Sequence, residues 1–371
     1  MPSSTNHQIA VVASQPSVRW QGRAARHLDA ERIQLPWEDP VTGGADPFIA
    51  VTSQGQICAT TSSASKLLKS VDGGQTWADR SIVTDPPFDG LQAFGILNDD
   101  TFLLSCEADT RVRVCRSEDL GATWELSPPL DTSPWERGGG GTHGSVLQLP
   151  NGTTLLPVTH WGGDVPSALF IHRSEDGGKT WGDRSRVCLW GTEASLLQLQ
   201  SGRLLIAIRY QGCGAPRWVL PHDPPGWTRD WLEMGLEVKQ VYVADSDDEG
   251  YTWRNWRRTT TGDFDAPGDL IQLSDGTVVL TYAHRAPDPA PCGTWAMISR
   301  DEGCTWERNR YVVNGVCPHS RAFDWGFSAS LVLHSDLILT LSGCRGEGWP
   351  KRAELNKNNP GRIHVIRWRL A

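Results

Sequence analysis

The sequence predicts an all-β fold, a six-bladed β-propeller in which every blade is a four-stranded antiparallel sheet. Three observations lead to this prediction. An octapeptide recurs five times within the 371 residues, and short apolar runs of strand length surround every copy. These runs come about four to a unit of roughly 50 residues, a period that is typical of propeller blades.

The octapeptide has the pattern Ser-x-Asp-x-Gly-x-Thr-Trp. Its Asp can accept hydrogen bonds from backbone N–H groups of its own turn, and its Gly can adopt a positive φ. The Thr-Trp pair then begins the next strand. We therefore interpret the five Asp residues as structural, and not as acid/base catalysts or calcium ligands. The five copies are Ser70–Trp77, Ser117–Trp124, Ser174–Trp181, Ser246–Trp253 and Ser299–Trp306.

The strands follow from the runs around each octapeptide. The third unit reads GSVLQLP, TTLLPVTH, SALFIHRSED and TWGDRSRVC, and Gly, Asp, Asn or Pro bounds each run. A sixth unit lacks the octapeptide and ends with the strand Ile363–Leu370. Because the ring must close, the N-terminal stretch 17–37 is expected to complete this last blade. Residues 1–371 are thus expected to form one domain, with residues 1–16 as a loosely ordered tail.

The composition argues against several classes of function. Lys and Arg number 35 and Asp and Glu 43, and the resulting charge of −8 disfavours nucleic acid as a partner. No stretch approaches the roughly 20 apolar residues of a membrane span, and no secretory signal is visible. The nine cysteines form no C-x-x-C pair, which favours reduced thiols in a cytoplasmic protein over a secreted protein with disulfides. No cluster has metal-site spacing, so no metal or other cofactor is expected, whereas a calcium held by backbone carbonyls and the oligomeric state stay open.

Candidate site residues follow from the architecture. A propeller binds ligands at the end of its axis where innermost strands begin and second strands end. Arg forks at these positions bind carboxylates bidentately, so an acidic oligosaccharide or glycoconjugate is the expected partner, and Trp faces can stack on its sugar rings. The candidates at strand starts are Asp46, His143, Glu193, Asp265 and Trp325, and those at strand ends are Glu107, His160, Trp161, Arg209, Tyr210, Tyr282, Arg285 and Arg345.

The octapeptide is identified as the Asp-box, or BNR repeat, and nearly the whole chain resembles the sialidase superfamily. That resemblance implies three arginines on the substrate carboxylate, a Tyr nucleophile activated by a Glu, and an Asp acid/base. The segment TEASLLQLQSGRLLIAIR resembles the family stretch that bears the activating Glu and the second arginine, which implies these roles for Glu193 and Arg209. Arg285 lies close to the position of the third arginine.

The chain departs from the family pattern at three other positions. The Arg-Ile-Pro motif of blade one appears as ADPFIAV, without the first arginine. No Asp follows at the acid/base position, where the chain reads ATTSSASKLL. The nucleophile position holds Phe327, and a phenyl ring can neither attack nor be deprotonated. A standard retaining sialidase mechanism is therefore not expected.

Three functions stay open at this point. A glycoside hydrolase would use Glu193 as base or activator, Asp265 as acid, and Arg209, Arg285 and Arg345 as an anion clamp. A polysaccharide lyase would use His143, His160 or Tyr210 as base, with Arg209 neutralising a uronate carboxylate. A glycan-binding propeller without catalysis would keep the same charged groups. The Glu193 and Arg209 match places the hydrolase ahead of the lyase.

Overall fold

The chain is described from a computed structural model. The structure describes residues 10–11, 18–20, 23–27, 31–34, 46–61, 66–82, 90–108, 111–135, 137–138, 146–162, 167–212, 238–259, 265, 267–284, 292–307, 310–317, 327–344 and 362–370. No helix among them is long and apolar enough to cross a membrane. Five of the cysteines are free thiols, namely Cys58, Cys106, Cys115, Cys188 and Cys304.

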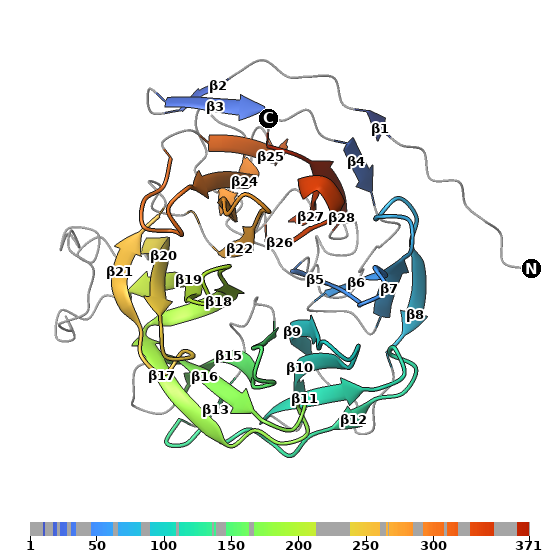
Figure 1. The fold of residues 1–371 in the computed structure, drawn as a ribbon, viewed down its shortest axis with the longest axis vertical. Coiled ribbons are helices and arrows are strands. Elements are labelled where there is room, and N and C mark those ends of the chain that lie inside the picture. Colours follow the sequence, from blue (N-terminus) through green and yellow to red (C-terminus); the bar gives the residue numbers. More distant parts are fainter. Residues whose placement is uncertain are drawn as a thin grey trace, which may run out of the picture.

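Six antiparallel sheets surround one axis, as predicted (Figure 1). Blade one contains β5 (Pro47–Val51), β6 (Ile57–Thr61), β7 (Lys66–Ser70) and β8 (Ala78–Ser81), and blade two contains β9 (Gly90–Ile96), β10 (Phe102–Ala108), β11 (Arg111–Ser117) and β12 (Glu125–Leu126). Blade three contains β14 (Leu147–Gln148), β15 (Thr154–Trp161), β16 (Ala168–Ser174) and β17 (Asp183–Leu189), with β13 (Arg137–Gly138) also paired to β15.

The second half of the ring repeats this arrangement. Blade four contains β18 (Gly191–Gln198), β19 (Leu204–Gly212), β20 (Val238–Ser246) and β21 (Arg254–Arg258), and blade five contains β22 (Gly268–Gln272), β23 (Val278–His284), β24 (Cys292–Ser299) and β25 (Arg310–Cys317). Blade six contains β26 (Ser328–Val332), β27 (Ile338–Cys344) and β28 (Arg362–Trp368), and a short 3₁₀ helix η1 (His334–Asp336) joins the first two.

The N-terminal stretch closes the ring differently from the expectation. β4 (Glu31–Gln34) pairs with β28 and completes blade six, and β1 (Ala10–Val11), within the expected tail, pairs with β4. The hairpin of β2 (Val18–Trp20) and β3 (Arg23–His27), however, joins blade five, where β3 runs parallel to β25. One short stretch thus covers the outer edges of two neighbouring blades, edges that would otherwise expose unpaired backbone groups.

Each Asp-box is held by its own side chains, which confirms the structural interpretation of the motif. In the first copy, Asp72 Oδ1 accepts hydrogen bonds from Ser70 Oγ (2.8 Å) and from the Thr76 backbone N–H (2.8 Å). The Trp77 indole donates to the Gly74 carbonyl (3.0 Å). The equivalent bonds to Asp119, from the Thr123 side chain and backbone, lower the pKa of that carboxyl.

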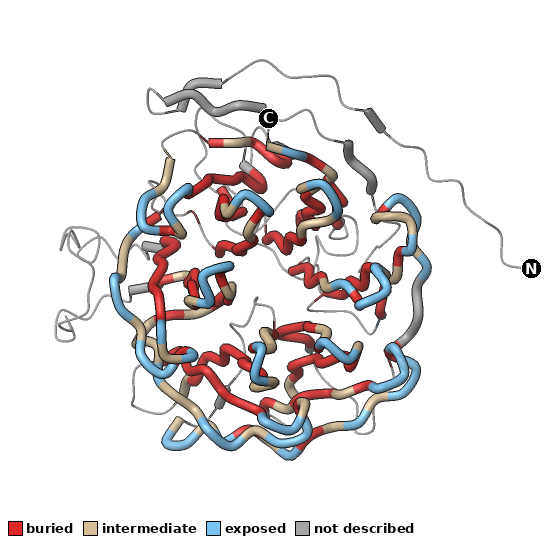
Figure 2. The backbone as a smooth tube through the Cα atoms, viewed as in Figure 1, coloured by how far each residue is buried: buried red, intermediate tan, exposed pale blue. Residues whose placement is uncertain are grey.

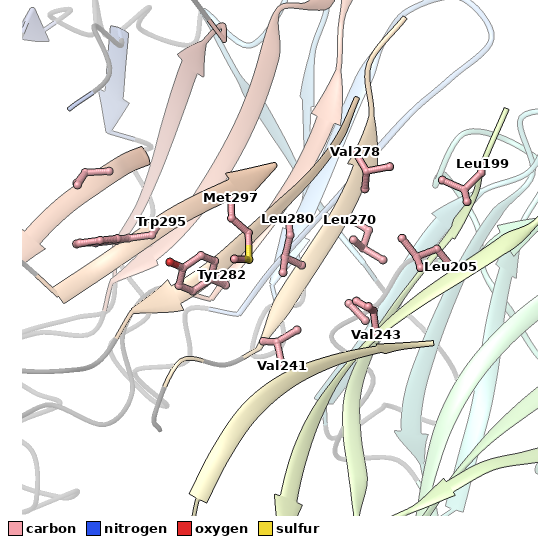
Figure 3. Packing of buried hydrophobic residues seen from close by; sticks show 12 residues of the cluster. Leu199, Leu205, Val241, Val243, Leu270, Val278, Leu280, Tyr282, Trp295 and Met297 are labelled. Carbon is pink, nitrogen blue, oxygen red and sulfur yellow. The ribbon is translucent and has the colours of Figure 1, made fainter. Parts of the chain in front are cut away.

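The apolar core lies between neighbouring blades. One cluster joins β19 and β20 of blade four to β22 and β23 of blade five through Leu205, Val243, Leu270 and Leu280 (Figure 3). Five similar clusters lie elsewhere in the described part of the ring. The strands are mostly buried and the turns between them mostly exposed (Figure 2). Burial of apolar faces between successive blades is therefore what fixes the ring.

Basic side chains add polar links between the first four blades. In each case the residue just before the Ser of one Asp-box donates to the carbonyl of the fourth residue of the next Asp-box. The three links are Lys69 Nζ to Leu120 O (2.6 Å), Arg116 Nε to Gly177 O (2.9 Å) and Arg173 Nη2 to Glu249 O (3.2 Å). They hold each Asp-box turn against its neighbour.

Candidate functional site

The candidate residues that the structure describes lie at one end of the propeller axis. In every blade except blade three, the start of the innermost strand pairs with the end of the second strand, as Thr192 does with Arg209 and Gly90 with Glu107. Asp46 directly precedes β5, and Asp265 precedes β22 by a few residues. We call this end the strand-start end. It is the end at which the sequence predicted the ligand site.

Glu193 and Arg209 form a buried ion pair at this end. Glu193 is 5% exposed, and Arg209 Nη1 donates to its Oε1 at 2.6 Å. Arg209 Nε also donates to Thr192 Oγ1 at 3.1 Å. A charge-assisted bond of this length is among the stronger polar contacts in proteins, so the carboxylate and the guanidinium fix each other's position.

A β-bulge presents Glu193. The register of β18 against β19 shifts between Thr192 and Ser195, so β18 carries one extra residue there. The backbone of Glu193 has φ +47°, a conformation uncommon for a residue other than glycine. Bulges re-aim side chains, and strained backbone of this kind gathers at functional sites because the surrounding structure must hold it in place.

Asp265 and His284 form a second pair at the strand-start end, in blade five. His284 Nδ1 lies 2.8 Å from Asp265 Oδ1, and both side chains are at most 1% exposed. The imidazole packs on the Trp295 ring with centroids 4.2 Å apart. The carboxylate therefore fixes the orientation of the imidazole ring.

The two candidate tyrosines pack into the core between blades. Tyr282 is 1% exposed, and burial raises the pKa of its phenol. Tyr210 packs edge-to-face against Tyr242 with centroids 5.5 Å apart. Both rings belong to apolar clusters, which is the packing role that β-strand tyrosines commonly have.

His160 differs from the expectation that it titrates near neutrality. Its side chain is fully buried, its Nε2 lies 2.9 Å from His172 Nε2, and its ring stacks on Phe170 at 4.4 Å. Burial and, to a smaller extent, the Arg184 charge lower the pKa of His160 to about 4. The imidazole is therefore neutral at pH 7. A proton carrier needs a pKa nearer the working pH.

The remaining candidates are placed only in part. Asp46 is buried, whereas Glu107 and Trp161 are half-buried. Phe327, at the nucleophile position of the resembled family, is 7% exposed and directly precedes β26. His143, Arg285, Arg345 and Trp325 lie outside the described residues. Within the described part of the chain, no group of three His, Cys, Asp or Glu side chains could hold a metal ion.

Asp269 is a buried carboxyl near this site that the sequence reasoning missed. It lies on the innermost strand β22, where its Oδ1 accepts from Ser195 Oγ (2.7 Å) and its Oδ2 from the Ser330 backbone N–H (2.6 Å). Burial raises its pKa to about 6. The only signal in the sequence was a carboxylate within the apolar run DLIQL.

Six antiparallel blades with five Asp-box turns define the class of protein, a BNR-repeat β-propeller. The chain belongs to the BNR repeat-like domain family, whose model matches residues 104–359. No curated protein matches the chain.

Several solved structures share the fold. A protein of unknown function from Dyadobacter fermentans is 19% identical with a TM-score of 0.64, and the match covers 90% of this chain and 97% of that one. The α-L-arabinofuranosidase of Fusarium graminearum, solved with arabinobiose, is 16% identical with a TM-score of 0.60 over 90% of this chain and 97% of that one. The Trypanosoma rangeli sialidase, solved with the inhibitor DANA, is 14% identical with a TM-score of 0.57 over 96% of this chain and 60% of that one.

Proposed function

We propose that this protein is a glycoside hydrolase that cleaves the bond of an acidic sugar at the strand-start end. The observation that carries the proposal is the buried Glu193 on a strained bulge, paired with Arg209, at the end where propellers bind ligands. Two of the proteins that share the fold, an α-L-arabinofuranosidase and a sialidase, are named as glycosidases. They support the class of reaction.

Each residue of the pair has a distinct part in this proposal. Glu193 is the base, or the activator of a nucleophile, because its carboxylate is fixed in position and can accept a proton. Arg209 binds the anionic group of the sugar. Its Nε and Nη1 are used by Thr192 and Glu193, and its Nη2 has no hydrogen-bond partner among the described residues. This nitrogen can donate to one oxygen of a carboxylate.

Asp265 acts as the proton donor in this proposal. His284 Nδ1 lies 2.8 Å from Asp265 Oδ1 and holds this carboxyl in position. The lyase alternative has His143, which lies outside the described residues, as its remaining candidate base. Its other two candidates pack in the sheets, His160 against His172 and Tyr210 against Tyr242.

The test is mass spectrometry of products from a panel of sialylated, uronate-containing and neutral arabinose-containing glycans. Hydrolysis predicts products whose summed mass exceeds the substrate by one water. Glu193→Gln is expected to lower kcat by about 10²–10⁴-fold, the usual share of a general acid or base. Arg209→Ala is expected to lower kcat/KM, because it removes the group that binds the anion of the sugar.

Glu302→Gln is the control, because it makes the same change in another ion pair with an arginine. Glu302 is the fourth residue of the fifth Asp-box and pairs with Arg203 at 2.9 Å, away from the strand-start end. The Glu302→Gln variant should keep wild-type turnover. Equal turnover in Glu193→Gln and wild type would overturn the assignment of Glu193, and products without added water would identify a lyase. A panel left wholly uncleaved would favour a glycan-binding propeller.

A further inference from the structure

Resting on the proposed function, we propose that Asp269 is a positioning residue that holds the Glu193 bulge, through Ser195, in the geometry that the reaction needs. Asp269 and Ser195 lie on the innermost strands of neighbouring blades, β22 and β18, which run side by side near the propeller axis (Figure 1). Nothing in the resemblance to sialidases gives either residue a role.

Side-chain hydrogen bonds hold both edges of the bulge. At the first edge, Thr192 Oγ1 accepts from Arg209 Nε at 3.1 Å. At the second edge, where regular pairing resumes, Ser195 Oγ donates to Asp269 Oδ1 at 2.7 Å. Glu193 lies between these two anchors. Its ion pair with Arg209 belongs to the first anchor, whereas the second anchor joins the bulge to a neighbouring blade.

The hydrogen bonds of the second anchor fix the orientation of the Ser195 hydroxyl. Its oxygen also accepts the Leu270 backbone N–H at 3.1 Å, so one donor and one acceptor fix its hydrogen. Asp269 is fixed in turn, because its Oδ2 accepts the Ser330 backbone N–H of β26 at 2.6 Å. One carboxyl therefore ties the bulge of blade four to the innermost strands of blades five and six.

Such anchoring matters because the bulge is strained. A residue other than glycine keeps a positive φ only while its surroundings enforce that conformation. Small displacements of a catalytic group also lower turnover strongly, since reaction requires close alignment of the reacting atoms. Asp269 is 8% exposed and both of its oxygens are used, so it acts through Ser195 and not on the substrate.

Ser195→Ala is the variant that isolates this link, and Ser342→Ala is its matched control. Ser342 is also a fully buried hydroxyl with two side-chain partners, Thr294 (2.7 Å) and Asn314 (3.0 Å), but it lies on β27 and does not contact the bulge. The two variants remove the same group at equal burial. A difference in behaviour between Ser195→Ala and Ser342→Ala therefore arises from where the lost hydroxyl lies, and not from the loss of a buried hydroxyl as such.

Three measurements are made on each full-length variant. Hydrogen exchange followed by mass spectrometry reports the backbone of residues 191–198, steady-state kinetics on the cleaved glycan reports function, and the melting temperature reports stability. In Ser195→Ala we expect exchange of this segment to rise about tenfold and kcat to fall about tenfold with KM within twofold. Ser342→Ala should change neither, even where its melting temperature falls equally. Asp269→Asn, which keeps the shape and an acceptor for Ser330, should give an intermediate loss of kcat.

Unchanged exchange in Ser195→Ala, or an equal rise in Ser342→Ala, would overturn the positioning role. A fall in kcat that follows melting temperature across all three variants would do the same, because it would show a purely structural effect. Failure of the proposed function is seen separately, as a wild-type protein that cleaves no glycan. Hydrogen exchange still decides whether Asp269 and Ser195 hold the bulge in that case.

Discussion

Asp269 should make the stability of the propeller fall as the pH rises. Burial raises the pKa of this carboxyl from 3.8 to about 6, so the folded state favours the protonated form more than the unfolded chain does. The stabilisation is fully present below pH 3.8 and is lost as the pH passes through about 6. A rise of roughly two pKa units corresponds to about 3 kcal/mol between these limits.

The assay compares wild type with Asp269→Asn by urea unfolding between pH 3.5 and pH 8. Asn is neutral throughout, and the other titrating groups are common to both proteins, so the difference in free energy of unfolding isolates Asp269. As the pH rises from 3.5 to 8, the free energy of unfolding of Asp269→Asn should increase by about 3 kcal/mol relative to that of wild type. Most of this change should fall between pH 4 and pH 6. The difference in free energy of unfolding could instead stay constant with pH or change in the opposite direction. Either result would refute the claim that the buried carboxyl of Asp269 makes stability depend on pH.

Two further predictions concern groups elsewhere in the fold. The His160 imidazole should titrate near pH 4 when followed by NMR. Because its pKa is lowered on folding, the stability that it contributes should be lost as the pH falls from 6.5 through 4. A titration midpoint above pH 6 would contradict its burial. Gly74→Ala should destabilise the protein by about 2–4 kcal/mol in thermal or urea unfolding, because a Cβ would lie 2.3 Å from a Leu339 side-chain carbon at φ +84°. Gly55→Ala is the control, because Gly55 has φ +77° and open space around the added Cβ, and it should cost only about 1 kcal/mol. Equal losses of stability in the two variants would mean that the contact with Leu339 contributes nothing.

The blades could be predicted because their turns are local. In the first Asp-box, Ser70, Asp72 and Thr76 bond to one another and to backbone within eight residues. The chemistry of such a turn is therefore written in consecutive residues, and five copies reveal the repeat. Glu193 and Arg209 could be found because they lie on adjacent strands of one hairpin, 16 residues apart in the chain.

The rest of the site depends on contacts across blades or within buried sheets. Asp269 meets Ser195 and Ser330, which are 74 and 61 residues away, and nothing local indicates those contacts. His160 lies at a strand end where the sequence predicted a ligand site, yet its imidazole is buried against His172, since side-chain direction depends on packing. The burial that shifts the pKa values of His160 and Asp269 exists only once neighbouring strands are assembled.

By itself, the sequence determined the propeller, its Asp-box turns and the end of the axis where Glu193 and Arg209 lie, because hydrogen bonds between near neighbours and strand periodicity encode them. Only the tertiary structure decided that Glu193 stands on a strained bulge, that Asp269 links three innermost strands, and that the β2–β3 hairpin joins blade five instead of blade six. These features depend on which distant strands lie side by side, and that choice is made by burial of apolar surface between blades.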